Sequence, residues 1–126
     1  MKKHFYKKEQ NVPLYHGKLV IIFTNDTERL KRCIPEFGDN EVHAQAWISD
    51  WKGFQGFFVI LNFKNSYSKI TNGMITHESI HIAHFIAKER GFKADFENDE
   101  PITYLAEFIT NEIYKFMDKH NFKAKL

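Results

Sequence analysis

The chain has very little cysteine, which limits how its fold can be stabilised. Cys33 is the only cysteine among 126 residues. A single thiol cannot form an intramolecular disulfide, so the fold depends on apolar packing and hydrogen bonds. The lack of disulfides is also typical of proteins in a reducing compartment.

Long apolar segments are missing as well. Residues 1–13 are charged and aromatic, and they contain neither the apolar region nor the small-residue cleavage site of a signal peptide. No apolar run reaches the roughly 20 residues that a transmembrane helix needs. These absences predict a cytoplasmic protein that has no membrane partner.

The chain has little excess charge of either sign. It carries 18 Lys and Arg against 16 Asp and Glu, a formal net charge of +2. This small excess does not favour a nucleic-acid partner or an anionic membrane. We interpret the lysines, which gather at the two ends, as a solvated basic rim, with a polyanion-binding patch as the alternative. They are Lys2, Lys3, Lys7, Lys8, Lys115, Lys119, Lys123 and Lys125.

Apolar residues make up 43% of the chain, and 13 of its residues are phenylalanine. This content suits one domain over residues 1–126 with an aromatic-rich core. Residues 1–17 form either a loose arm or an edge strand. Three further segments have the composition of strands: a β-branched run at 18–23, an alternating pattern at 41–48 and a continuous apolar run at 54–63. A turn is expected at 49–53.

Three segments carry helix signals. They are 24–34, capped by Thr24 or Asn25; 71–91, capped by Thr71 or Asn72 and closed by Gly91; and 100–119, opened by Glu100 and Pro101. Together the segments predict an α+β fold, in which a small, mainly antiparallel sheet packs on two principal helices.

The central feature of the chain is the motif His77-Glu78-Ser79-Ile80-His81 inside the second of these helices. Residues four apart lie one above the other on a helix, so His77 and His81 can direct two imidazoles at one metal ion. Glu78 lies beside them, where a carboxylate can take a proton from a metal-bound water.

A catalytic zinc site usually has three protein ligands, so a third must come from elsewhere in the chain. The downstream acids are Glu97, Asp99, Glu100, Glu107 and Glu112. Glu100 and Glu107 project to nearly the same side of one helix but lie about 10 Å apart along its axis, so only one can reach the ion. We interpret His84 as a partly buried or hydrogen-bonded histidine near the site rather than a ligand.

The segment 74–104 resembles the gluzincin metallopeptidases. The likeness rests on His77, Glu78 and His81 together with the later stretch Asn98-Asp99-Glu100-Pro101-Ile102-Thr103-Tyr104. It implies a minimal zincin-like fold, zinc as the cofactor, and His77, His81 and Glu100 as its ligands. It also implies that Glu78 is the catalytic base. The chain is similar to small metallopeptidase-like proteins encoded by phages and prophages as well.

One position departs from the thermolysin-like pattern, which has an aspartate four residues after the ligand glutamate. Tyr104 stands there in this chain, and a phenol orients a zinc-bound histidine less strongly than a carboxylate does. His43, Tyr104 and Tyr114 are all candidates for stabilising an oxyanion.

These features predict a zinc-dependent hydrolase that cleaves peptide bonds in a peptide or protein substrate by means of a metal-bound water. The strand at 41–48 would border the cleft and pair with an extended peptide. The first alternative is a catalytically inactive, phage-related binding module with a zincin fold. A nucleic-acid-binding domain is the second alternative, and the small net charge favours it less.

Overall fold

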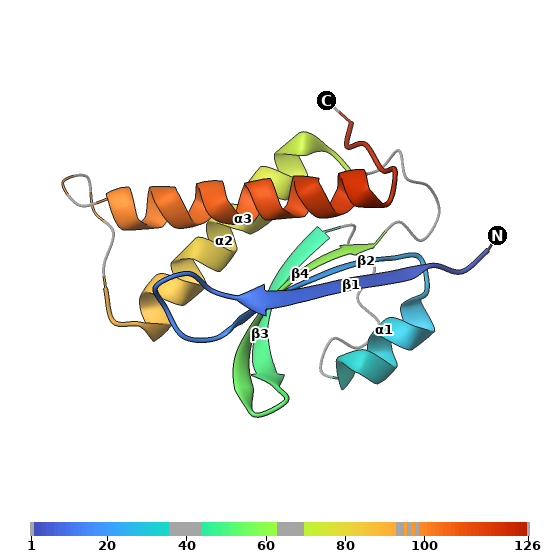
Figure 1. Ribbon diagram of the computed structural model, residues 1–126, viewed down its shortest axis with the longest axis horizontal. Helices are drawn as coiled ribbons and strands as arrows, with labels where there is room; N and C mark the ends of the chain where they lie inside the picture. The colour runs from blue at the N-terminus through green and yellow to red at the C-terminus, as the bar shows by residue number, and fades with distance from the viewer. Residues whose placement is uncertain are drawn as a thin grey trace.

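A computed structural model describes residues 2–35, 44–62, 70–92, 95, 97 and 99–125 of the chain. Seven elements follow one another in these residues (Figure 1): β1 (Phe5–Asn11), β2 (Lys18–Thr24), α1 (Thr27–Cys33), β3 (Ala44–Trp51), β4 (Phe54–Asn62), α2 (Asn72–Glu89) and α3 (Glu100–Lys119). The predicted α+β class is confirmed. No helix in the described ranges is long and apolar enough to cross a membrane.

The four strands form one sheet in the order β1-β2-β4-β3. β1 pairs with β2 and β3 with β4 in antiparallel fashion, whereas β2 and β4 are parallel. The sheet is therefore mainly antiparallel, as the sequence predicts. Residues 5–11 form an edge strand, which decides between the two interpretations of the N-terminal segment, and β3 forms the opposite edge.

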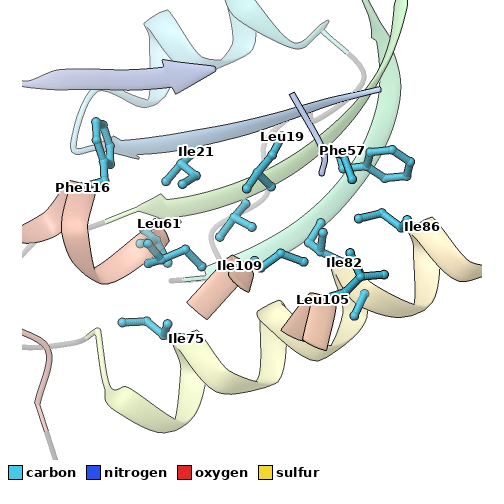
Figure 2. Close-up of a cluster of buried hydrophobic side chains, with 14 of the residues drawn as sticks. Leu19, Ile21, Phe57, Leu61, Ile75, Ile82, Ile86, Leu105, Ile109 and Phe116 are labelled. Carbon is cyan, nitrogen blue, oxygen red and sulfur yellow. The ribbon is translucent and has the colours of Figure 1, made fainter. Parts of the chain in front are cut away.

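The two central strands are buried because both of their faces are covered. On one face α2 and α3 pack over the sheet, and side chains such as Leu19, Phe57, Ile82 and Ile109 form the main core (Figure 2). On the other face, α1 covers a smaller cluster. Strands that are buried on both faces have continuous apolar sequences, which explains the runs in β2 and β4.

The alternating side chains of β3 contact the apolar clusters on the two opposite faces of the sheet. Ala44, Ala46 and Ile48 pack against the main core, whereas Trp47 packs against the cluster under α1. Successive side chains of a strand point to opposite faces, so a two-sided sheet can use both sets. Residues 41–43 of the predicted strand lie outside the described residues.

The predicted turn at 49–53 is wrong in extent. β3 continues through Trp51, which pairs with Phe54, so only Lys52 and Gly53 connect the strands. Both residues have positive φ, 51° and 83°. A two-residue hairpin loop with two positive φ angles matches the right-handed twist of its strands. Asn or Asp usually precedes the glycine in such a loop. Lys52 occupies that position here, so the sequence does not indicate a two-residue loop.

The predicted cap of the first helix is also wrong. Asp26 is the N-cap of α1, and its carboxylate accepts a hydrogen bond from the Arg29 amide at 3.1 Å. Thr24 and Asn25 are buried and bind the N-terminal segment instead. Both side chains hydrogen-bond the backbone of His4. Their burial beside β1 uses the hydroxyl and amide groups that would otherwise cap the helix.

The caps of α2 agree with the prediction and place the motif on a helix of 18 residues. The Thr71 hydroxyl accepts a hydrogen bond from the Met74 amide at 3.1 Å. At the other end Gly91 has φ of +75°, and the Phe92 amide donates to the Ala87 carbonyl at 3.0 Å. This is the Schellman arrangement, which satisfies the last carbonyls of a helix.

Candidate metal centre

The motif lies where one side of α2 emerges from the core. Ile75, Ser79, Ile82 and Ile86 face the interior and are buried, whereas His77 and His81 are exposed. The spacing of the buried residues is that of an amphipathic helix. Because the core occupies the apolar side of α2, the two histidines meet each other at its solvent-facing side.

The two imidazoles lie against each other. The Nε2 atoms of His77 and His81 are 3.0 Å apart, and the ring centroids are separated by 4.6 Å. The ring of His81 also stacks on Phe85, with 6.2 Å between centroids and 22° between planes. His81 is thus held between a histidine one turn before it and an aromatic ring one turn after it.

Glu78 completes the group and differs from the histidines in its burial. Only 7% of Glu78 is exposed. Its Oε1 atom accepts a hydrogen bond from the backbone amide of Ala46 at 3.1 Å. Buried carboxylates require such partners, because losing water without replacement is costly. The bond joins α2 to the edge strand β3, a contact that the spacing of the motif alone does not reveal.

The three side chains form the one group of potential metal ligands found among the described histidines, cysteines and acids. One ligand atom from each of His77, Glu78 and His81 lies within 4.8 Å of the others. Two nitrogens 3.0 Å apart can both lie about 2.1 Å from one ion, the usual zinc–imidazole distance. The donor set therefore fits zinc, for which imidazole is a common ligand.

The predicted third ligand, Glu100, is not a member of this group. It is exposed in the first turn of α3 and borders an apolar groove of about 430 Å³ together with Leu14 and Tyr104. Glu107, the alternative, is exposed and outside the group as well. The choice between these two glutamates stays a prediction.

Glu112 is engaged elsewhere in the molecule. Its carboxylate contacts three side chains, Gln10 at 2.9 Å, Lys115 at 3.0 Å and Lys8 at 3.8 Å. Two of these residues belong to β1, at the edge of the sheet opposite β3. Glu112 therefore links α3 to β1 and is not available to His77 and His81.

The remaining candidates from the sequence are distributed around the site. His84 is exposed, which contradicts the partly buried alternative, and it lies outside the ligand group. Tyr104 is 64% exposed. The Tyr114 hydroxyl donates a hydrogen bond to Asn72 at the start of α2, and burial raises the pKa of this phenol. His43 lies outside the described residues.

Comparisons with known proteins do not assign this arrangement to a family. No family model matches the chain, and neither a curated protein nor a solved structure is significantly similar to it. The chemistry of the site must therefore be inferred from its own geometry.

Proposed function

We propose that the protein is a zinc-dependent hydrolase of peptide bonds. The proposal rests chiefly on one observation: the His77 and His81 Nε2 atoms lie 3.0 Å apart beside the carboxylate of Glu78. Two imidazoles and an adjacent acid on one helical turn are the groups that metal-assisted hydrolysis uses. The resemblance of segment 74–104 to the gluzincins supports the same chemistry.

Each residue has a distinct role in this proposal. His77 and His81 would hold the ion, which when bound would polarise the scissile carbonyl and a water molecule. Glu78 would take a proton from the attacking water and later pass it to the leaving amine. The Ala46 amide orients the Glu78 carboxylate through Oε1, leaving the second oxygen to receive the proton.

The third ligand is proposed to be Glu100, with Glu107 as the alternative. Glu100 opens α3, and the resemblance assigns a glutamate at this point to the metal. β3, whose Ala46 contacts Glu78, is the edge strand beside the site. An extended substrate could pair with this edge by main-chain hydrogen bonds.

The first test is metal content and peptide cleavage in four proteins. The unchanged protein and His84→Ala are expected to bind one zinc ion at neutral pH, whereas His77→Ala is expected to bind none. His84 is the matched control because it is exposed on the same helix and outside the ligand group. Glu78→Gln should retain zinc but lose peptide cleavage by on the order of 10²-fold or more. Zinc binding that survives His77→Ala would refute the site, and full activity in Glu78→Gln would refute the mechanism.

One observation favours the second candidate, a binding module without catalysis. The ligand group holds two histidines and Glu78, and no acid from α3 joins it. A site with two histidine ligands and no third would hold metal weakly and position substrate poorly. This candidate predicts zinc binding to the unchanged protein without cleavage of any member of a broad peptide library.

A further inference from the structure

The two ends of the chain that carry most of its lysines meet at one groove. This basic groove has a volume of about 530 Å³ and lies between β1 and the last turns of α3. Lys7 and Lys8 line it from β1, and Lys115 and Lys119 line it from α3. The groove is at the β1 edge of the sheet, whereas His77 and His81 lie on α2 beside the β3 edge.

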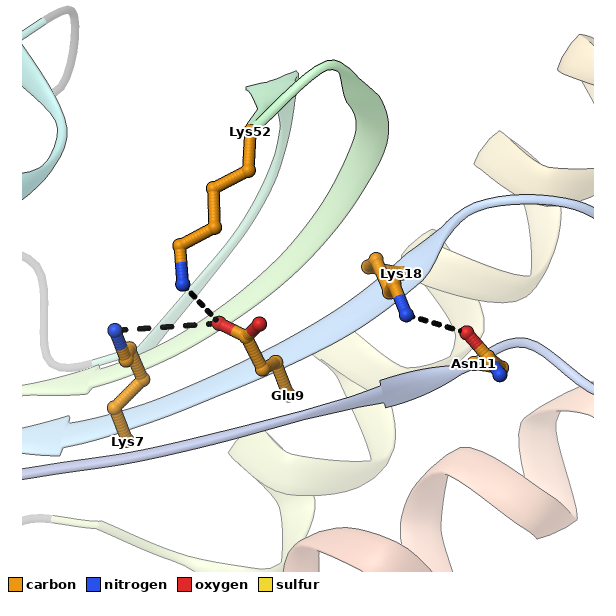
Figure 3. Close-up of polar contacts among 5 residues, drawn as sticks. All are labelled: Lys7, Glu9, Asn11, Lys18 and Lys52. Atoms are coloured by element: carbon orange, nitrogen blue, oxygen red, sulfur yellow. Dashed lines mark hydrogen bonds and ion pairs between the residues drawn. The ribbon is translucent and has the colours of Figure 1, made fainter.

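The groove is positively charged because its described lining has four lysines and no carboxylate. The nearest acid on β1, Glu9, contacts Lys7 at 4.0 Å and Lys52 at 3.4 Å (Figure 3). Glu9 therefore offsets part of the positive charge of Lys7.

On the α3 side, Glu112 is likewise shared between two lysines, Lys8 and Lys115. Lys119 lies on the last turn of the helix, outside these ion pairs, and lines the groove there. His120 lines the same end, and burial together with Lys119 lowers its pKa. The positive charge at neutral pH therefore comes from the lysines.

The groove also runs along an edge of the sheet. His4 accepts a backbone hydrogen bond from the residue after β2, and Val12 donates one to the residue before β2. Hydrogen-bonded and non-hydrogen-bonded pairs alternate along an antiparallel ladder. Every second residue of β1, from Phe5 to Asn11, therefore directs its N–H and C=O groups away from β2. No strand follows β1 on that side within the described residues.

Aromatic side chains form the apolar part of the lining. Phe5, Tyr6 and Phe116 border the groove, and the ring of Tyr6 stacks on His120 with 4.0 Å between centroids. A β-strand presents side chains alternately to opposite sides. Every second side chain of an added strand would therefore face the α3 side, where Lys8 and Lys119 lie beside the ring of Tyr6.

We propose that the groove binds an extended acidic peptide, which adds to the sheet as a fifth strand along β1. The strand edge provides repeated main-chain donors and acceptors, and the lysines provide charge complementarity. A nucleic acid would satisfy the lysines but could not use the alternating backbone groups of the edge. The preferred ligand is a segment in which Glu or Asp alternates with apolar residues.

The test measures binding of a labelled peptide of about eight residues, with Glu and Val in alternation, by fluorescence anisotropy. Lys119→Glu should weaken binding about tenfold. Lys123→Glu is the matched control, because Lys123 is exposed and close in the chain but outside the lining. Lys123→Glu should change the affinity less than about twofold, because the salt in the assay buffer screens charges that are distant from the peptide. Circular dichroism verifies that both variants are folded.

A second arm tests the strand edge itself. The same peptide with N-methyl groups on alternate residues should lose binding in one of the two possible phases, because one phase removes the amides that pair with β1. Binding should also persist in His77→Ala, which separates this site from the metal centre. Three results would overturn the proposal: equal losses in Lys119→Glu and Lys123→Glu, no effect of N-methylation in either phase, or tighter binding of a single-stranded oligonucleotide of equal charge.

Discussion

Glu112 shows how one residue can stabilise the fold in a pH-dependent way. It is 9% exposed and accepts hydrogen bonds from Gln10 and Lys115, with Lys8 nearby. Burial alone would raise the pKa of its carboxyl. The hydrogen bonds and the lysines outweigh burial and lower this pKa below its ordinary value. The ionised form is therefore more stable in the folded state than in the unfolded state.

Glu112→Gln should lower the free energy of unfolding by roughly 1.5–3 kcal/mol at pH 7, the range for hydrogen bonds to charged groups. A carboxyl with a lowered pKa stabilises the fold above its unfolded pKa and loses this contribution as pH falls through its folded pKa. The difference between the variant and the unchanged protein should hence shrink at pH 3. Urea unfolding at both pH values measures it, and a constant difference would contradict the assigned charge interaction.

Among the elements, α2 has a C-terminus whose conformation a single substitution can test. Gly91 has φ of +75°, and a Cβ added there would meet no atom within 4 Å. Gly91→Ala should therefore destabilise the protein by about 1 kcal/mol through backbone strain alone. Gly73, in the first turn of the same helix, has no positive φ and only Thr71 near its added Cβ, at 3.8 Å.

Gly73→Ala is the matched control with the opposite sign. Alanine is the better helix former by about 0.8–1.0 kcal/mol, so this variant should be more stable than the unchanged protein. Thermal unfolding of both variants gives the comparison. If Gly91→Ala were neutral, the left-handed conformation at the end of α2 would not be required.

The boundaries of the elements were predictable where the signal was local. Thr71 and Gly91 delimit α2 because a hydroxyl cap and a left-handed glycine act within a few residues. The prediction failed where tertiary contacts overrode local preference. Thr24 and Asn25 bind the buried backbone of His4 instead of capping α1, and Lys52 adopts a positive φ that its residue type does not indicate.

In the candidate site, too, the local contacts were predictable from the sequence and the tertiary contacts were not. His77, Glu78 and His81 are adjacent because a helix brings residues four apart together, and their side chains do lie close together. The ligand set of His77, His81 and Glu100 stays a prediction. The amide of Ala46 was not predictable as the partner of Glu78, because that contact depends on how β3 packs beside α2. The basic groove was not predictable for the same reason, since Lys8 and Lys115 come together only when β1 packs beside α3.

At the scale of the whole molecule, the candidate metal centre and the basic groove are associated with opposite edges of one sheet. β3 contacts Glu78 at one edge, and β1 borders the lysines at the other. The C-terminal segment lies beside the start of α2, because the Lys125 carbonyl accepts a hydrogen bond from the Asn72 amide at 2.7 Å. The start of the helix that carries the motif is thus tied to the end of the chain.

Zinc should raise the stability of the whole protein, because a ligand that binds only the folded state shifts the unfolding equilibrium. At a free zinc concentration of 100 times Kd the gain is about 2.7 kcal/mol, and a chelator should reverse it. Zinc bound by His77 and His81 alone would depend on α2 only. If Glu100 is the third ligand, the ion also joins α3 to α2, and Glu100→Gln should reduce the gain in stability at a fixed zinc concentration.

Glu107→Gln is the control for this measurement, because Glu107 is equally exposed on α3 and is the alternative ligand. Thermal unfolding with and without zinc in both variants decides between the two glutamates. A reduced gain in Glu100→Gln alone supports Glu100, and a reduced gain in Glu107→Gln alone supports the alternative. If both variants respond to zinc as the unchanged protein does, neither glutamate binds the ion. The centre would then be confined to α2, which would favour the binding module over the hydrolase.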